Sequence, residues 1–341
     1  MGIDGLHDAL RRSRLLRRRV LLYERYANKR IAVDVSDWLH WAKYHVLKET
    51  GRVPTADDIV EACCDRVDLL LEHQAIPVLV FDGAAVPAKA ETDARRRAQR
   101  DEARQAAVEL RAAGDLAAVN QKLTEALPVT HALALQFRQE VQSRWGDSVE
   151  ILVAPYEADA QLAALARSGD VDAVVTRDGD TLAYLVPRVL FNLSADGRVD
   201  ELVLADLLGA TLGVRRPVDL RRFNDSAWQL ACCLAGCDYV KSVRGVGFMK
   251  ALELVDEHDG DGTAILQAIE DDPGLGAAPV GYEDRLLRAW FTYRHQTVYD
   301  PATGTTKPLT PLSAAVVEMY GAAPQFLGAQ LEPLRPRGEV G

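Results

Sequence analysis

The chain has 341 residues, of which 48% are hydrophobic and 26% are charged, the composition of a globular rather than a disordered protein. Its formal net charge of −10 argues against a uniformly basic nucleic-acid binder. No window approaches the run of about 18 apolar residues that a membrane span needs, and arginines follow the N-terminus without an apolar signal core, so we expect neither a membrane partner nor secretion.

Short β-branched runs alternate with longer amphipathic stretches through the first two thirds of the chain. The predicted strands are Ile31–Val35, Pro77–Phe81, Glu150–Val153, Ala173–Thr176 and Arg188–Leu193. The predicted helices between them are Asp57–Gln74, Pro128–Trp145 and Tyr156–Arg167. This alternation predicts an α/β fold with a mostly parallel, twisted sheet flanked by helices.

Two regions depart from the alternation. Nearly seventy residues separate Asp82 from the strand at Glu150, and within them the Ala/Arg/Glu-rich stretch Lys89–Ala113 predicts a helix. Three arginines of this helix recur every four residues and so share one face: Arg96, Arg100 and Arg104. A solvated surface helix and a phosphate-binding helix both fit this pattern.

The C-terminal third has a different pattern. Beyond residue 205 we expect no further strands, and the pattern is helical to about residue 294. The last thirty residues are rich in Pro, Gly and Ala, which predicts a flexible tail.

Acidic residues follow four of the predicted strands. These acids, together with one that follows the apolar helix Ala227–Ala235, are Asp34, Asp82, Glu157, Asp159, Asp178, Asp180 and Asp238. Each alone is explained as a helix cap or a turn residue. Carboxyl ends of parallel strands meet at one edge of the sheet, however, and caps need no such alignment.

Seven acids gathered on one edge would repel one another and raise their own pKa values. Divalent cations remove this penalty, and an oxygen-only ligand set without His or Cys suits Mg²⁺, with Mn²⁺ as a substitute. Two such ions about 4 Å apart act as a clamp for in-line displacement at phosphorus. The acids therefore predict a two-metal phosphodiesterase.

Four motifs resemble those of the flap endonuclease/xeroderma pigmentosum group G family of structure-specific 5′ nucleases. They are Met1–Leu6, Val78–Gly83, Val153–Leu162 and Leu234–Tyr239, and the resemblance covers roughly residues 1–310. Further matches resemble the exonuclease 1 branch of the family: Trp38–His40, Pro128–Ala132, Val298–Pro301 and Lys307–Leu309.

The resemblance implies a PIN-like 5′-nuclease core with a helical arch and a helix–two-turn–helix. The implied regions are a nuclease region at 1–99, an arch at 100–136, a second nuclease region at 137–225, a DNA-binding helix–two-turn–helix region at 226–310 and a flexible tail at 311–341. The sequence from Asp238 to Lys250 is similar to that helix–two-turn–helix, and its Gly245 and Gly247 permit a tight turn.

The resemblance also implies roles for single residues. One metal would lie among Asp34, Asp82, Glu157 and Asp159, and the other near Asp178, Asp180 and Asp238. Lys89 and Arg96 would be the cations beside the scissile phosphate. The implied DNA contacts are Gly2, His40, Arg100, Lys241, Ser242, Arg244, Gly245, Gly247 and Lys250. A K⁺ ion would bind at Ser242, Val243 and Val246.

Two features depart from the family pattern. Arg177 stands where the family usually has Glu, which places a cation among the predicted metal ligands. Ser36 and Asp37 replace a more apolar, often aromatic pair, which affects how the end nucleotide would stack. All seven acids are nevertheless present.

The resemblance implies a Mg²⁺-dependent 5′→3′ double-stranded DNA exonuclease that also cuts 5′ flaps and leaves 5′-phosphate products. It further implies DNA with 5′ ends, nicks or flaps as the partner, mismatch-repair proteins by analogy, a monomer, and the nucleus as location. Three alternatives stay open: a flap endonuclease proper, although residues 325–330 supply no sliding-clamp motif, a non-catalytic DNA-binding module, and an RNA-cutting relative.

Overall fold

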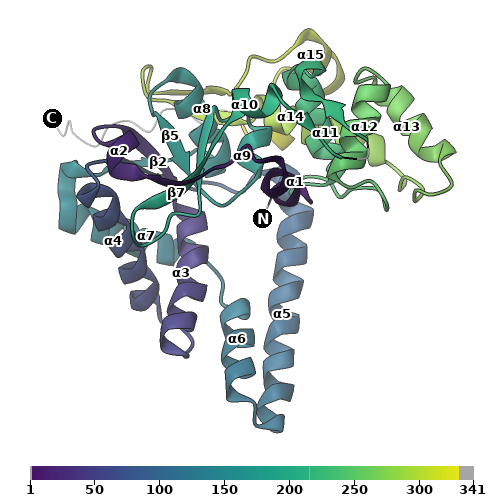
Figure 1. Cartoon of the computed structure of the whole chain (residues 1–341). Coiled ribbons are helices and arrows are strands. Elements are labelled where there is room, and N and C mark those ends of the chain that lie inside the picture. The colour runs from purple at the N-terminus through teal and green to yellow at the C-terminus, as the bar shows by residue number, and fades with distance from the viewer. Residues whose placement is uncertain (1, 215, 330–341) are drawn as a thin grey trace.

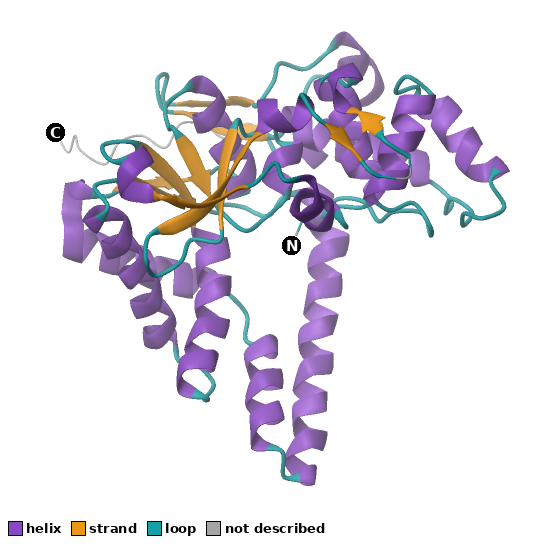
Figure 2. Ribbon diagram, viewed as in Figure 1, coloured by secondary structure: helices purple, strands orange, loops and turns teal. Residues whose placement is uncertain are grey.

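A seven-stranded sheet forms the centre of the protein (Figure 2). The computed structural model describes residues 2–214 and 216–329. In order across the sheet, the strands are β1 (Arg17–Leu21), β7 (Arg198–Val203), β6 (Arg188–Phe191), β5 (Ala173–Val175), β2 (Arg30–Asp34), β3 (Ile76–Phe81) and β4 (Glu150–Val153). Strands β2 to β6 pair in parallel, and β7 runs antiparallel to β1 and β6. The predicted α/β fold with a mostly parallel sheet is confirmed.

Helices cover both faces of this sheet (Figure 1). Side chains alternate along each strand: Ala32 and Val78 belong to one core cluster with α8 and α11, while Val33 belongs to a second with α3, α4 and α7. Bounds of the helices named here are α3 (Val35–Thr50), α4 (Ala56–Glu72), α7 (His131–Trp145), α8 (Ala158–Ser168) and α11 (Asp225–Ala235). Strands buried on both faces explain the near-continuous apolar runs in the sequence.

The five predicted strands all exist, but other strands were not predicted. Strand β1 begins with three exposed arginines and β7 mixes acids with apolar residues, so neither has the apolar run of a central strand. The expectation of no strands beyond residue 205 is wrong, because β8 (Thr211–Leu212) pairs with β9 (Val218–Asp219). These two-residue strands are too short to give a periodicity. A further hairpin joins β10 (Thr297–Asp300) to β11 (Thr305–Pro308).

A pair of helices projects away from the sheet (Figure 1). The predicted helix at Lys89–Ala113 is confirmed as α5 (Ala90–Ala113), and it packs against α6 (Leu116–Ala126). Only three residues of α5 are buried: Thr92, Ala103 and Ala107. One end of α5 lies at the carboxyl edge of the sheet, where a short 3₁₀ helix, η1 (Pro87–Lys89), leads into it.

The C-terminal part of the chain is largely helical. Its helices are α12 (Phe248–Glu257), α13 (Gly262–Asp271), α14 (Tyr282–His295) and α15 (Ala314–Tyr320), and α11 packs against α12 and α14. The remaining short elements are α1 (Leu6–Ser13), α2 (Leu22–Tyr26), α9 (Asp180–Ala183), α10 (Leu204–Leu208), η2 (Gly146–Ser148), η3 (Leu220–Arg222) and η4 (Gln325–Leu327). Within the described residues, none of these helices is long and apolar enough to cross a membrane.

The predicted flexible tail is wrong for its first part. Helix α15 and η4 pack onto α14 through an apolar cluster that contains Phe291, Phe326 and Leu327. The hydroxyl of Tyr156 donates a hydrogen bond to the carbonyl of Ala329 at 3.0 Å. This segment therefore docks beside the predicted active-site residue Glu157, which follows Tyr156. The rest of the predicted tail, residues 330–341, lies outside the described residues.

Two glycines of the C-terminal segment allow a test of this docking. Gly321 and Gly328 both have positive φ angles, 83° and 87°, so an alanine is strained at either. A Cβ atom at Gly328 would also overlap the Tyr156 ring, whereas at Gly321 it would meet nothing within 4 Å. We expect Gly328→Ala to destabilise the protein by about 2 kcal/mol more than Gly321→Ala in chemical denaturation. Equal losses would show that the segment does not dock on Tyr156.

Candidate active site

The predicted acids gather at the carboxyl edge of four adjacent strands, β5, β2, β3 and β4. Asp34 is the last residue of β2, and Asp82 directly follows β3. Glu157 and Asp159 lie at the start of α8, which follows β4, and Asp178 and Asp180 follow β5. Asp238 reaches the same place from the loop after α11, where a cleft contains most of these acids.

Hydrogen bonds hold several of these carboxylates in fixed positions. Asp34 caps α3 by accepting from the Asp37 amide at 3.0 Å, and it also accepts from the Thr176 hydroxyl at 3.0 Å. The Thr176 hydroxyl in turn accepts from the Asp178 amide, which links the ends of β2 and β5. Asp82, which is exposed, accepts from the Ala158 amide at 2.7 Å. Capping and clustering are thus compatible roles for the same residue.

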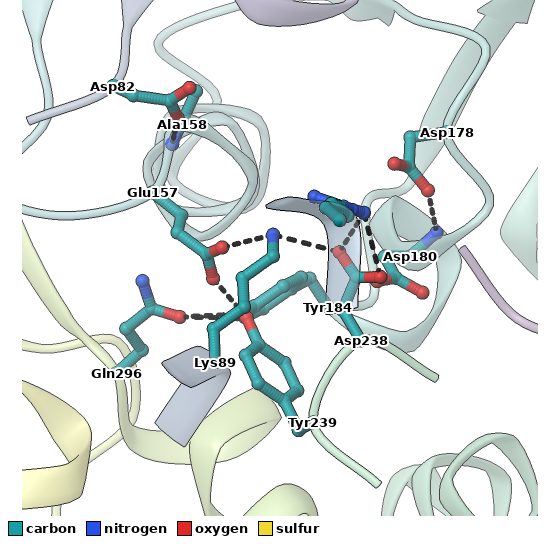
Figure 3. Close-up of polar contacts among 11 residues, drawn as sticks. Asp82, Lys89, Glu157, Ala158, Asp178, Asp180, Tyr184, Asp238, Tyr239 and Gln296 are labelled. Atoms are coloured by element: carbon teal, nitrogen blue, oxygen red, sulfur yellow. Dashed lines mark hydrogen bonds and ion pairs between the residues drawn. The ribbon is translucent and has the colours of Figure 1, made fainter. Parts of the chain in front are cut away.

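Two cations neutralise one side of the acid cluster (Figure 3). The Lys89 ammonium forms ion pairs with Glu157 and, at 2.8 Å, with Asp238. Arg96 donates to both oxygens of Asp238, at 2.9 and 3.0 Å. Burial opposes charge on all of these groups, but the ion pairs outweigh it: they lower the pKa of Asp238 and raise the pKa of Lys89.

Other acids in the cluster have no such partner. One carboxylate oxygen of Asp159 and one of Asp180 are buried without any hydrogen-bond partner among the described residues. Burial, followed by the charges of neighbouring aspartates, raises the pKa values of Asp159 and Asp180 well above the ordinary range. Burial, followed by the charges of neighbouring aspartates, also raises the pKa of Asp34. Buried acids with raised pKa values and unpaired oxygens are the feature expected of a site that binds cations.

The chemistry of these donors fits Mg²⁺ or Mn²⁺, because every donor is a carboxylate oxygen. Among the described residues, no three of these side chains converge as they stand into a group that could hold a metal ion. The Lys89 ammonium lies between Glu157 and Asp238 instead, so a cationic side chain takes part of the neutralising role. The seven acids stay the predicted ligands of divalent ions, and Asp159 and Asp180 each have one unused oxygen.

A buried hydrogen-bond chain behind Glu157 was not predicted. The Tyr239 hydroxyl donates to Glu157 and lies 2.6 Å from the Tyr184 hydroxyl, which donates to Gln296 (Figure 3). Tyr239 directly follows the predicted ligand Asp238, and Thr176 lies two residues before the predicted ligand Asp178. This closeness in sequence was the only available signal for either residue. Tyr184 and Gln296 carried no signal, because their role depends on tertiary packing.

Arg177 and Asp37, which both depart from the family pattern, contact each other in the structure. Arg177 donates from its side chain to the Asp37 carboxylate, at 2.7 and 2.9 Å, and its amide donates to the same carboxylate at 3.1 Å. The expected intrusion of Arg177 among the metal ligands is therefore not seen, since its guanidinium is held by Asp37. The side chain of Asp37 is only 2% exposed, so Arg177 neutralises a buried charge.

Three of the predicted DNA contacts, Gly2, His40 and Arg100, lie near the acids, and their contact with DNA stays a prediction. Gly2 packs so closely on the Asp178–Asp180 turn that a Cβ atom there would overlap Asp178. His40 lines both the acid cleft and an adjoining pocket, and Arg100 lines that pocket. Burial, together with the charges of Lys43, Arg96, Arg177 and Arg100, lowers the pKa of His40 to about 3, so its ring is neutral at physiological pH.

The predicted helix–two-turn–helix lies between α11 and α12. Gly245 has a φ of 92°, in agreement with the predicted tight turn, but Gly247 is extended and a Cβ atom there would meet nothing. Lys241 and Arg244 are exposed, Ser242 and Lys250 are half-buried, and Val243 and Val246 are buried. Binding of DNA or K⁺ by this loop stays a prediction.

Family models describe more than half of this chain. The XPG N-terminal domain matches residues 1–103, and the XPG I-region matches residues 148–238. Flap endonuclease 1 of Ostreococcus lucimarinus is 32% identical over 287 residues, which cover 80% of this chain and 69% of that protein. Exonuclease 1 of Xenopus laevis is 30% identical over 314 residues, covering 91% of this chain but 41% of that protein.

A solved structure agrees with these matches at the level of the fold. The catalytic core of Rad2 in complex with a DNA substrate has a TM-score of 0.57 at 22% identity, over 79% of this chain and 72% of that one. The chain belongs to the XPG family of structure-specific 5′ nucleases. It spans about two fifths of the length of the Xenopus exonuclease 1.

Acids with raised pKa values and acids with lowered pKa values should respond oppositely when each is replaced by a neutral residue in metal-free protein: the first change should raise stability and the second should lower it. The raised pKa of Asp180 means that its contribution to stability falls as pH rises above about 3.9, the unfolded value. The lowered pKa of Asp238 means that its contribution is present above that value and is lost only in acid. At pH 7.5 in EDTA we expect Asp180→Asn to raise Tm, and Asp238→Asn to cost about 3 kcal/mol by leaving Lys89 and Arg96 underpaired.

Addition of Mg²⁺ should raise the Tm of the unaltered protein more than that of Asp180→Asn, because binding to the folded state stabilises it. A lower Tm for Asp180→Asn in EDTA would contradict the assignment of Asp180 as an uncompensated buried charge.

The pairing of Arg177 with Asp37 predicts energetic coupling. In a cycle of Arg177→Gln, Asp37→Asn and the double variant, we expect a coupling free energy of about 1 kcal/mol in chemical denaturation, modest because Arg177 is 38% exposed. The exposed pair Arg288–Asp284 on α14 is the control, and we expect it to have a coupling free energy of about 0.3–0.5 kcal/mol. Additive losses at residues 37 and 177 would mean that the two departures are independent.

Proposed function

We propose that this chain is a Mg²⁺-dependent 5′→3′ double-stranded DNA exonuclease with 5′-flap endonuclease activity, which leaves 5′-phosphate products. The observation that carries the proposal is that one cleft brings together six of the seven predicted carboxylates with the cations Lys89 and Arg96. Carboxylates bind divalent ions, and ammonium and guanidinium groups bind phosphate. A site with both is suited to a phosphodiester.

Divalent ions bound by these acids would activate water and stabilise the leaving oxygen. The chain's own residues have separate tasks. Lys89 and Arg96 now neutralise Glu157 and Asp238, and on binding DNA they would turn to the scissile phosphate and stabilise its developing charge. Tyr239 holds Glu157 in place from the protein interior. The buried surroundings of the cluster strengthen each of these interactions.

The proposed DNA contacts follow the predicted regions of the chain. The helices α5 and α6 would form the arch beside the displaced strand, with Arg100 facing it, and the loop at Lys241–Lys250 would bind the duplex backbone with help from K⁺. His40 would stack on the end nucleotide as a neutral ring. The proposed setting is DNA repair and recombination in the nucleus, including mismatch repair and end resection, which rests on the likeness to exonuclease 1.

A flap endonuclease proper is the second candidate, supported by the flap endonuclease 1 match. One assay separates the two: duplex DNA labelled at a recessed 5′ end and a 5′-flap substrate, each incubated with Mg²⁺. Stepwise mononucleotide release from the recessed end supports the exonuclease, and cutting confined to the flap junction supports the flap endonuclease. We expect Asp178→Asn and EDTA to abolish both activities.

Lys89→Met should lower kcat by about 10²–10³ because it removes a charge that acts on the reacting phosphate. The matched control is Lys48→Met, since Lys48 is exposed at the far end of α3. Binding of both DNA substrates without any cleavage would refute catalysis and leave a non-catalytic DNA-binding module.

A further inference from the structure

A second pocket adjoins the acid cleft and has the opposite charge. It has a volume of about 580 Å³ and is lined by residues of α3, α5, α6 and the segment that follows α6. Four cationic side chains line it: Lys43, Arg96, Arg100 and Arg177. Asp37, His40 and Arg96 line both the pocket and the acid cleft, so the two are continuous. The pocket is large enough for a small ligand rather than for a single ion.

The carboxylates of this pocket leave two of its cations, Lys43 and Arg100, without an ion pair. Asp37 is engaged by Arg177, and Glu125 pairs with Lys122 at 2.6 Å. Arg96 pairs with Asp238 in the acid cleft. Throughout residues 2–214 and 216–329, no carboxylate lies within ion-pair distance of Lys43, and the same is true of Arg100.

Lys43 is the most unusual of these cations. It lies on the buried face of α3 among Leu39, Ala42 and Val46, where an apolar residue would be expected, and it is only 3% exposed. Its ammonium donates to the Leu127 carbonyl at 2.6 Å and lies 5.5 Å from the Tyr44 ring centre. A buried ammonium needs three hydrogen bonds and an opposite charge to offset its lost hydration.

The electrostatic state of Lys43 agrees with a missing anion. Burial, and then the charge of Arg100, lowers the pKa of Lys43 to about 8. An anion placed between Lys43 and Arg100 would offset both causes, because it supplies the opposite charge and separates the two like charges. Lys43 and Arg100 together therefore have the charge and the burial that suit an anionic ligand.

We propose that this pocket binds the terminal 5′-phosphate of the DNA strand being degraded, with Lys43 and Arg100 supplying its charge-assisted hydrogen bonds. Arg177, fixed by Asp37, also lines this pocket. The inference rests on the proposed function, since the strand would run from the carboxylates past His40 into the pocket. It makes Lys43 a specificity residue that distinguishes phosphorylated from hydroxyl ends.

The test compares two recessed-end duplexes that differ only in a 5′-phosphate or a 5′-hydroxyl. Equilibrium binding is measured by fluorescence anisotropy in EDTA, and kcat/KM for release of the first nucleotide is measured in Mg²⁺. We expect the unaltered protein to prefer the phosphorylated end by about tenfold, both in binding affinity and in kcat/KM. Lys43→Met should reduce this ratio towards one and leave binding of the hydroxyl end unchanged. Arg100→Gln should also reduce the ratio.

Lys48→Met is the matched control, because it removes an exposed lysine of the same helix and should keep the tenfold ratio. Thermal unfolding of Lys43→Met verifies its fold, and its Tm should not fall, since a buried charge is removed. Equal binding of both ends by the unaltered protein, or equal weakening of both ends by Lys43→Met, would overturn the proposal. Preferential binding of the phosphorylated end without cleavage would keep the pocket and refute the proposed exonuclease.

Discussion

Mutual repulsion among carboxylates is the constraint on which this structure depends. A parallel sheet brings the ends of β5, β2, β3 and β4 to one edge, and each end carries at least one acid. Two of these acids retain buried oxygens without partners, and several have raised pKa values. Such an edge is stable only if positive charge comes close to it. Lys89 and Arg96 supply part of that charge, and divalent ions are suited to supply the rest.

The neutralising cations come from outside the sheet, which links distant segments to the site. Lys89 lies in η1 and Arg96 in the projecting helix α5, so this helix is tied to the acids by ion pairs. The 3₁₀ helix η4 packs against η1, and Tyr156 contacts the carbonyl of Ala329. Correct placement of Lys89 therefore involves the C-terminal segment as well as α5. Substrate that attracts Lys89 or Arg96 away from the acids would alter these same contacts.

The sequence predicted the parts of the site that depend on local pattern. Strands β2 to β6 have apolar runs, and the acids that follow them are visible because strand ends are where side chains meet in a parallel sheet. Edge strand β1 lacks such a run, and the docking of Phe326 depends on a partner on α14. Arg177 and Asp37 lie 140 residues apart, so each stands as a separate departure when only the sequence is read. Lys43 interrupts an apolar face, but periodicity alone does not show what surrounds it.

The acidic character of the whole chain is consistent with a DNA enzyme once the position of its charges is considered. The net charge of −10 includes the buried acids of the site, which divalent ions would neutralise. Positive charge is concentrated where DNA would pass: Lys89 and Arg96 at the cleft, and Lys43 and Arg100 in the pocket beside it. Buried cations are screened by salt much less than exposed ones. Enclosed cations at the cleft and in the pocket can therefore hold a DNA end at salt concentrations that weaken exposed contacts, and such an arrangement favours recognition of ends.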